Sequence, residues 1–264
     1  MLALTRAVPP SIQRCELTHL QREPIDYARA VLEHAAYEDA LRTLGCRVER
    51  LPDLPEHPDS VFVEDTAIVF DQVAVIARPG AASRRGEIES TARVLEKHRP
   101  LAYIQAPATL DGGDVLVTPG RVFVGISGRT NADGARGLAA ILAPHAIEVV
   151  PVTVTGCLHL KSAVTLVPPE AGREGHAVPR LLLNPAWIDR AFFSGFDLID
   201  VDPSEPDAGN VLLVGDRLVC AEAPTKTRRR LEALGLSTLI VPAGELAKAE
   251  GGLTCGSILL TAEK

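Results

Sequence analysis

The residue best placed for chemistry is Cys255, which stands in the segment EGGLTCGS. Gly251 and Gly252 precede it, and Gly256 follows it, directly before an apolar run. Because glycine tolerates close backbone approaches and unusual turns, this setting predicts a thiol held at the end of an element, where it can face a cavity. Such a thiol could be a nucleophile, although a small buried hydrophobic residue is the alternative for any single cysteine.

A histidine that could assist this thiol is His159, in GCLHLKSAVT. Read as the start of a strand, the segment directs Cys157, His159 and Lys161 to one face and the leucines to the other. Taken alone, His159 could equally be a core histidine. However, breaking a C–N bond needs a nucleophile, a proton donor for the departing amine and a base for water, and one imidazole can fill the last two roles.

The acidic residues form two groups, one in PDSVFVEDTAIV (Asp59, Glu64 and Asp65) and one in TLDGGDVLV (Asp111 and Asp114). A carboxylate pair inside a Val, Phe and Ile strand run is costly to bury without a cationic partner. A guanidinium ligand is such a partner, because its planar N–H donors match carboxylate oxygens in pairs. Turn capping or contact with water explains Asp59 and Asp114 equally well.

Two arginines could bind the carboxylate of a ligand that has a guanidinium at its other end. Arg84 in GAASRRGE and Arg129 in GISGRTN both occupy loops before helix patterns, from which a side chain can reach a ligand. For each of them an ordinary surface charge is the alternative.

The elements that must position these residues follow an internal repeat. Residues 113–152 and 209–242 share the same order of two short β-branched runs, an amphipathic helix and a closing strand, and the segments from Ser60 and Leu160 follow it too. A fifth copy arises if the C-terminal strand SILLT pairs with the N-terminal strand MLALTRAV. The repeat of about 50 residues predicts one closed ring of ββαβ modules, a single α/β propeller domain over residues 1–264.

A doubly wound parallel sheet is the alternative fold. The paired strands before each helix fit it poorly, and no GxGxxG follows a strand.

Composition indicates an ordinary globular protein, with 264 residues, 46% of them hydrophobic and 23% charged. The formal net charge of -7 argues against binding of nucleic acid and is compatible with a cationic small molecule. No apolar run is long enough to span a membrane, and no signal peptide begins the chain, so we expect a cytoplasmic protein. Five widely spaced cysteines without a CxxC pair disfavour a disulfide framework and a structural zinc site, and Cys15, Cys46 and Cys220 should be reduced and buried.

Several motifs together resemble the dimethylarginine dimethylaminohydrolases over nearly the whole chain: PDSVFVEDTAIV, RPGAASRRGE, LDGGDV, SGRTN, LHLKS and GGLTCGS. This family belongs to the guanidino-group-modifying enzymes, so the resemblance implies their five-bladed α/β propeller, the pentein fold with pseudo-fivefold symmetry. It also implies hydrolysis of Nω-methylated or dimethylated L-arginine to L-citrulline and methylamine or dimethylamine.

The resemblance implies a role for each matching residue. Cys255 is similar to the family's nucleophile, His159 to its general acid and base, and Asp111 to the acid that orients the histidine. Asp59, Glu64 and Asp65 are expected at the guanidinium region, and Arg84 and Arg129 at the α-carboxylate. Leu17 is expected to act as a lid, and Ala249 to contact the ligand through its backbone.

No cofactor is implied, and no metal for turnover, although Cys255 and His159 could bind an inhibitory zinc ion as in some relatives. Two departures concern Ala249, which is smaller than the aliphatic residue expected and could loosen the pocket, and Cys157, which could offer another zinc or oxidation site. No Lys or Arg adjoins Cys255 in the sequence, so we expect its thiol to stay neutral until a cationic substrate arrives.

Other functions stay open at this stage. An arginine or agmatine deiminase would use the same cysteine to release ammonia, but typical arginine deiminases carry a helical insertion that this chain lacks. An amidinotransferase would pass the amidino group to an amine. A catalytically silent propeller that binds arginine derivatives would not need a nucleophile. Homodimerisation is also open.

Overall fold

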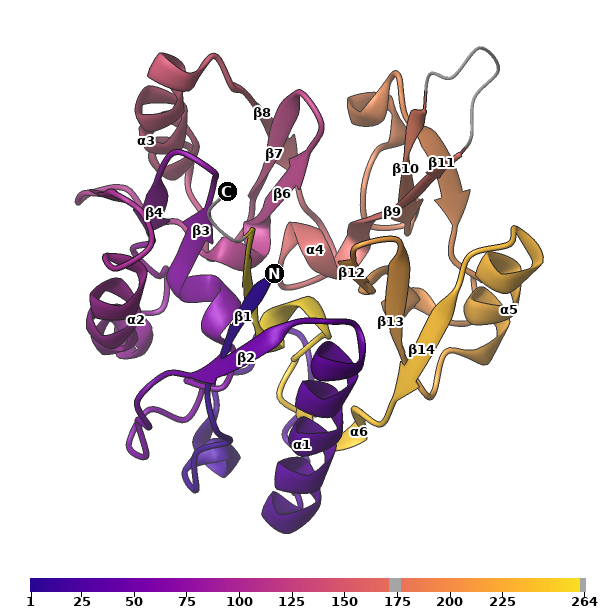
Figure 1. Cartoon of the computed structure of the whole chain (residues 1–264), viewed down its shortest axis with the longest axis horizontal. Coiled ribbons are helices and arrows are strands. Elements are labelled where there is room, and N and C mark those ends of the chain that lie inside the picture. Colours follow the sequence, from indigo (N-terminus) through magenta and orange to yellow (C-terminus); the bar gives the residue numbers. More distant parts are fainter. Residues whose placement is uncertain (171–176, 262–264) are drawn as a thin grey trace.

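A computed structural model describes residues 1–170 and 177–261 of the chain. Their strands form five three-stranded sheets that are arranged as a ring around a central axis (Figure 1). In every sheet the first two strands along the repeat pair antiparallel, and the third pairs parallel to the middle strand. This is the strand order that the repeat predicts, and the five-module ring is confirmed.

Each sheet has an inner, a middle and an outer strand. In that order the sheets are β15 (Ile258–Leu260), β1 (Leu2–Thr5) and β2 (Arg47–Arg50); β3 (Ala67–Val69), β4 (Ala74–Ile76) and β5 (Leu101–Tyr103); β6 (Val115–Thr118), β7 (Arg121–Ile126) and β8 (Glu148–Thr153); β9 (Val164–Glu170), β10 (Val178–Leu183) and β11 (Asp197–Asp200); and β12 (Leu212–Val214), β13 (Arg217–Ala221) and β14 (Thr238–Val241). The first sheet joins the two ends of the chain, as predicted, because Leu4 on β1 pairs with Ile258 on β15.

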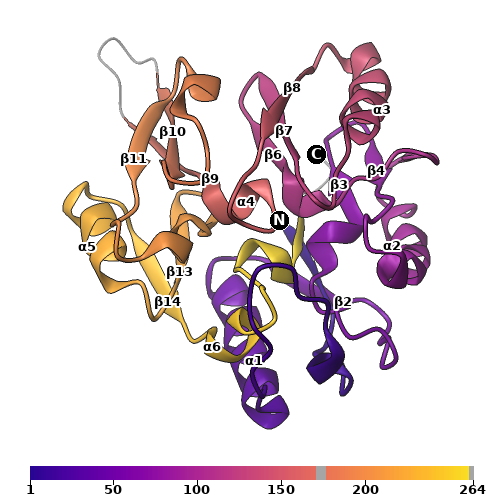
Figure 2. The same cartoon turned by 180° about the vertical axis from the view of Figure 1, so that it is seen from behind.

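Helices cover the outside of the ring, seen from the opposite side in Figure 2. They are α1 (Tyr27–Thr43), α2 (Ile88–Leu95), α3 (Ala132–Leu142) and α5 (Thr225–Ala233). Two helices are short: α4 (Leu160–Ala163) lies toward the centre, and α6 (Gly244–Ala247) lies beside α1. Polar residues begin two of them: Asp26 accepts a hydrogen bond from the backbone of Arg29, and Asn131 accepts one from Gly134. No helix in the described part of the chain combines the length and apolar character of a bilayer span.

The fourth module departs from the predicted order. Between β10 and β11 the described chain forms a 3₁₀ helix, Arg190–Phe193, where the other modules have an α-helix. Its Phe193 is buried and packs its ring against Phe123 of the third module, with ring centroids 4.9 Å apart. A short connection that inserts an aromatic ring therefore replaces the amphipathic helix.

The hydrophobic core is divided among the junctions between modules. Each of five clusters combines residues of two neighbouring sheets; Leu4 and Ile258 of the first sheet, for example, pack with Ile76 of the second. Each module thus buries its apolar faces against both neighbours. This arrangement supports the single-domain organisation over residues 1–264, which stays a prediction.

The inner strands of all five sheets line a central cavity of about 300 Å³. Glu64, Lys161 and Thr254 also line this cavity. Because Thr254 adjoins Cys255 and Lys161 lies two residues after His159, the cavity reaches the segments that carry the predicted nucleophile and histidine.

Ring closure through the shared first module can be tested with Leu4→Ala. Leu4 is 0% exposed, so its truncation should lower the free energy of unfolding in urea by about 2–5 kcal/mol. Ile240→Ala on β14 removes the same kind of side chain at a position that is 46% exposed, and should change stability by less than about 0.5 kcal/mol. Equal losses in the two variants would contradict the closed ring.

Candidate active site

Cys255 lies in a 3₁₀ helix, Thr254–Gly256, immediately before β15, and is 8% exposed. Its Sγ accepts a hydrogen bond from the backbone of Gly252 at 3.4 Å. A Cβ on Gly251 would collide with the ring of Phe62, and one on Gly252 would collide with the amide of Asn210. The glycines are thus required by close packing, which holds the thiol at the element end that the sequence predicts.

The thiol of Cys255 is neutral in the free protein. Burial raises its pKa to about 12, and the negative charges of Glu64 and Asp65 act in the same direction. Lys161 acts in the opposite direction, but neither it nor any other cation of the described residues outweighs these effects, which agrees with the expectation from the sequence.

His159 is the N-cap residue of α4 and is 3% exposed. Its Nε2 lies 3.1 Å from Oδ2 of Asp111, and its Nδ1 lies 3.8 Å from Oδ1 of Asp65. Burial lowers the pKa of His159, but the charges of Asp65, Asp111 and Asp114 outweigh burial and raise it to about 9. The imidazole is therefore charged at neutral pH.

The strand predicted for the His159 segment is wrong, because the chain turns and enters a helix there. Alternation consequently fails: Cys157 is buried in an apolar cluster, and its Sγ is directed to the carbonyl of His159. Lys161 instead reaches the centre of the site, where its Nζ pairs with Oε1 of Glu64 at 2.5 Å.

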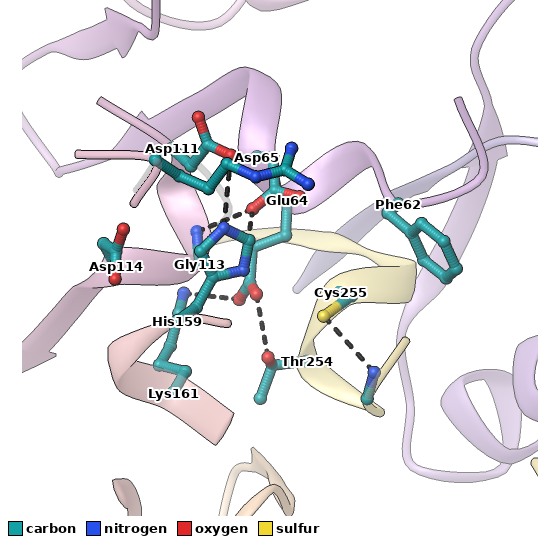
Figure 3. A network of polar contacts seen from close by, with 12 residues as sticks. Phe62, Glu64, Asp65, Asp111, Gly113, Asp114, His159, Lys161, Thr254 and Cys255 are labelled. Atoms are coloured by element: carbon teal, nitrogen blue, oxygen red, sulfur yellow. Dashed lines mark hydrogen bonds and ion pairs between the residues drawn. The ribbon is translucent and has the colours of Figure 1, made fainter. Parts of the chain in front are cut away.

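Glu64 and Asp65 lie on a 3₁₀ helix, Val63–Thr66, and not inside a strand as predicted. In a strand the two side chains would point to opposite faces, whereas the tighter turn directs Glu64 toward Lys161 and Thr254 and Asp65 toward Gly113 and His159 (Figure 3). Glu64 also accepts a hydrogen bond from Thr254, next to Cys255, at 2.8 Å. Burial raises the pKa of Glu64, while Lys161 opposes this shift.

Asp65 is a carboxylate whose pKa the site lowers. Its burial raises the pKa, but His159 and Arg84 more than compensate and lower it to about 2. Asp65 accepts from Nη1 of Arg84 at 2.5 Å and from the backbone of Gly113 at 2.8 Å. The protein thus supplies its own cations to these acids, and the guanidinium contact stays a prediction.

Arg84 is 3% exposed, and every nitrogen of its guanidinium donates within the protein. Besides Asp65 it contacts both oxygens of Glu87 and the backbone carbonyls of Asp59 and Phe62. Through these contacts Arg84 fixes the positions of Asp65, Glu87 and the backbone before the Glu64 segment. Its predicted contact with a substrate carboxylate stays a prediction, and in this arrangement the carboxylate would have to compete with Asp65 and Glu87.

The rim of the site is formed by the Leu17 loop, residues 15–22. Leu17 packs in one apolar cluster with Ala249 and Cys255. Asp59 accepts the backbone N–H of Glu16 at 3.2 Å, and burial raises the pKa of Asp59 to about 6. Arg129 donates from Nη2 to Oγ1 of Thr18 at 3.2 Å. The Leu17 loop therefore contacts three other residues that the sequence predicts at the ligand, namely Ala249, Asp59 and Arg129.

Asp114 does more than cap a turn, which was the role considered from the sequence. It is fully buried, accepts the backbone N–H of Leu160 at 2.9 Å, and accepts the hydroxyl of Ser127 at 2.6 Å. Ser127 in turn accepts the N–H of Arg129 at 3.0 Å. One carboxylate thereby fixes the backbone next to His159 and the loop that carries Arg129, contacts that a sequence pattern does not reveal.

Among the described residues, one group of side chains could hold a metal ion: Asp65, Asp111 and His159, whose candidate ligand atoms lie within 4.8 Å of one another. Cys255 is not part of this group. The zinc site expected at Cys255 and His159 stays a prediction.

The role of Asp114 can be tested with Asp114→Asn. Loss of its charge removes one influence that raises the pKa of His159, so an NMR titration should find that pKa below the native value of about 9. Asp216→Asn, in the exposed turn between β12 and β13, is the matched control and should leave the pKa of His159 unchanged. The same pKa in both variants would remove Asp114 from the electrostatics of the site.

Comparison with known proteins places this site in a family. No family model matches the chain. The N(G),N(G)-dimethylarginine dimethylaminohydrolase of Streptomyces coelicolor is 39% identical over 262 residues, which cover 98% of this chain and 96% of the relative. The protein of the same name from Pseudomonas aeruginosa is 33% identical over 235 residues, covering 88% and 89%.

A solved structure agrees with the sequence comparison. The Pseudomonas aeruginosa enzyme, as a cysteine-to-serine mutant complexed with citrulline, matches with a TM-score of 0.88 and 31% identity, and each chain covers 97% of the other. Fold and sequence agree over almost the entire length. The chain belongs to the dimethylarginine dimethylaminohydrolase family.

Proposed function

We propose that this chain hydrolyses Nω-methylated L-arginines, both asymmetric dimethylarginine and monomethylarginine, to L-citrulline and dimethylamine or methylamine. The observation that carries the proposal is that a neutral, buried Cys255 and a charged His159 lie in one site among buried carboxylates (Figure 3). Such a site favours a cationic ligand that activates the thiol on arrival.

The carboxylates of the site have capacity for a guanidinium. The buried acids that act on His159 are Asp65, Asp111 and Asp114. The buried cation in contact with this group is Arg84, so negative charge is in excess. Each carboxylate offers about four lone-pair sites, and Glu64 and Asp65 each accept two hydrogen bonds from the protein. A planar guanidinium can use the remaining sites of both acids, which brings its central carbon toward Cys255.

The first half of the reaction uses both unusual protonation states. The bound cation favours loss of the Cys255 proton to solvent, and the thiolate attacks the guanidinium carbon. His159, charged before the substrate arrives, gives its proton to the departing dimethylamine. The C–N bond breaks, and a covalent S-alkylthiouronium remains on Cys255.

The second half reverses the role of His159. Its neutral imidazole removes a proton from water, the resulting hydroxide attacks the thiouronium carbon, and citrulline leaves as the thiolate is released. Asp111, hydrogen-bonded to Nε2, holds the ring in place through both halves. No cofactor or metal enters these steps.

The amino-acid end of the substrate would meet the rim. Arg129 is the cation proposed for the α-carboxylate. Asp59 is expected from the sequence at the guanidinium region, but it contacts Glu16 of the Leu17 loop, and we propose it instead as the acid for the α-ammonium group. Leu17 would cover the ligand, and Ala249 would offer its backbone. Arg84 contributes by holding Asp65 and the carbonyl of Asp59 in position. Homodimerisation and a cytoplasmic location stay predictions.

Product analysis tests the reaction and the nucleophile. Wild type is expected to form citrulline and dimethylamine from asymmetric dimethylarginine, and Cys255→Ser should form neither, since the hydroxyl is a far weaker nucleophile. His159→Ala should lower kcat by about 10²–10⁴ while substrate binding persists.

Arginine and agmatine are the control substrates for this assay, beside asymmetric dimethylarginine and monomethylarginine. Ammonia released from either control would assign the chain to the deiminases instead. Binding of all four compounds without turnover would leave an arginine-derivative binding protein.

The neutral thiol predicts a pH dependence of alkylation. Because the pKa of Cys255 is raised to about 12, the thiolate fraction at pH 7 is small, and the rate of reaction with iodoacetamide should rise about tenfold per pH unit without levelling below pH 9. Cys255→Ser corrects for the other cysteines. A plateau reached near pH 7 would show a thiolate in the free enzyme and contradict substrate-dependent activation.

A further inference from the structure

Glu250 has an unusual backbone for its residue type. Its φ is 59°, and the other described non-glycine residue with a positive φ is Ala146. Glu250 follows α6 closely, and the N–H of Gly251 bonds back to the carbonyl of Leu246 at 3.1 Å. This is the helix C-terminal position that normally favours glycine, because a Cβ destabilises the left-handed conformation.

The side chain of Glu250 makes long-range contacts that explain why an acid stands there. Its carboxylate accepts the backbone N–H groups of three consecutive residues of the Leu17 loop: Thr18 at 3.0 Å, His19 at 2.5 Å and Leu20 at 2.7 Å. Consecutive N–H groups that converge in this way form a concave site for an anion. The left-handed backbone aims the Glu250 carboxylate into that site.

The contact joins two segments of the proposed active site. Glu250 adjoins Ala249, which packs with Cys255, while the loop it holds carries Leu17 into the same apolar cluster. The loop is also tied to Asp59 through Glu16 and to Arg129 through Thr18, but each of these ties uses a single residue of the loop. Glu250 alone among these three partners binds three successive amides.

We propose that Glu250 is a positioning residue that latches the Leu17 loop over Cys255, and that it sets how readily a ligand enters and leaves. The proposal rests on the proposed function in so far as Leu17 covers a substrate. Glu250 does not touch Cys255 or His159 in any described contact, so its effect is on binding and not on the chemical steps.

Glu250→Gly separates this role from a structural one. Glycine suits the positive φ, and this gain offsets part of the stability lost with the three hydrogen bonds, so the melting temperature of the variant should stay close to that of wild type. Loss of hydrogen bonds to a charged group should nevertheless speed amide hydrogen exchange at residues 18–20 by about tenfold or more and raise KM by a similar factor, with no decrease in kcat. Faster exchange in the loop together with weaker substrate binding, in a variant whose fold stays intact, identifies a latch.

Two further variants complete the experiment. Glu250→Gln keeps one oxygen acceptor but loses the charge, so its exchange rates and KM should lie between those of wild type and Glu250→Gly. Glu23→Gln removes an exposed acid three residues after Leu20 and is the matched control for charge near a cationic substrate. It should change neither exchange nor KM.

The outcomes are distinguishable. Unchanged exchange at residues 18–20 in Glu250→Gly would overturn the latch, and so would faster exchange with an unchanged KM. An equal rise of KM in Glu23→Gln would assign the effect to charge and overturn it as well. Because exchange is measured without substrate, it tests the contact even if wild type turns over no methylarginine, a result that would count against the proposed function alone.

Discussion

The interaction on which the site depends is the buried contact between Arg84 and Asp65. The guanidinium of Arg84 binds the carboxylates of Asp65 and Glu87. It also binds the backbone carbonyls of Asp59 and Phe62, which precede the 3₁₀ helix Val63–Thr66, and so holds all four groups in one arrangement. Removing one partner of a buried pair costs about 3–5 kcal/mol, because the other charge is left uncompensated. Asp65 in turn faces His159, and its negative charge is the largest of the influences that raise the pKa of the imidazole.

The same carboxylates raise two pKa values, and the consequences for charge are opposite, because the protonated thiol is neutral and the protonated imidazole is charged. Negative charge near a thiol opposes its ionisation, and negative charge near an imidazole favours its protonation. Glu64 and Asp65 thus help to keep Cys255 neutral while Asp65 and Asp111 keep His159 charged. In the proposed mechanism, the positive charge of the bound substrate opposes these negative charges at Cys255, so activation of the thiol coincides with binding.

The ring was predictable because each module repeats the same local pattern of alternation and turns. The predicted nucleophile, histidine and orienting acid were identified from sequence motifs. The fold brings the residues of these motifs into one site. The prediction of local structure was wrong at two places. The segments around Glu64 and His159 were predicted as strands because their apolar neighbours alternate. Packing at the centre of the protein instead folds them into short helices. The sequence named Asp114 only as an acid that could cap a turn, and did not single out Glu250, because their partners are distant in sequence, at Ser127, Leu160 and residues 18–20.

The ion pair of Glu64 and Lys161 lies where the central cavity meets the active site, since both residues line that cavity and Glu64 also contacts Thr254 beside Cys255. Passage of a molecule between the two spaces would have to separate these buried, oppositely charged groups. The pair therefore separates the central cavity from the active site and leaves the side of the Leu17 loop for entry. In the proposed reaction, amine and water then use the same route, so the amine must leave before the water that completes the cycle can take its place.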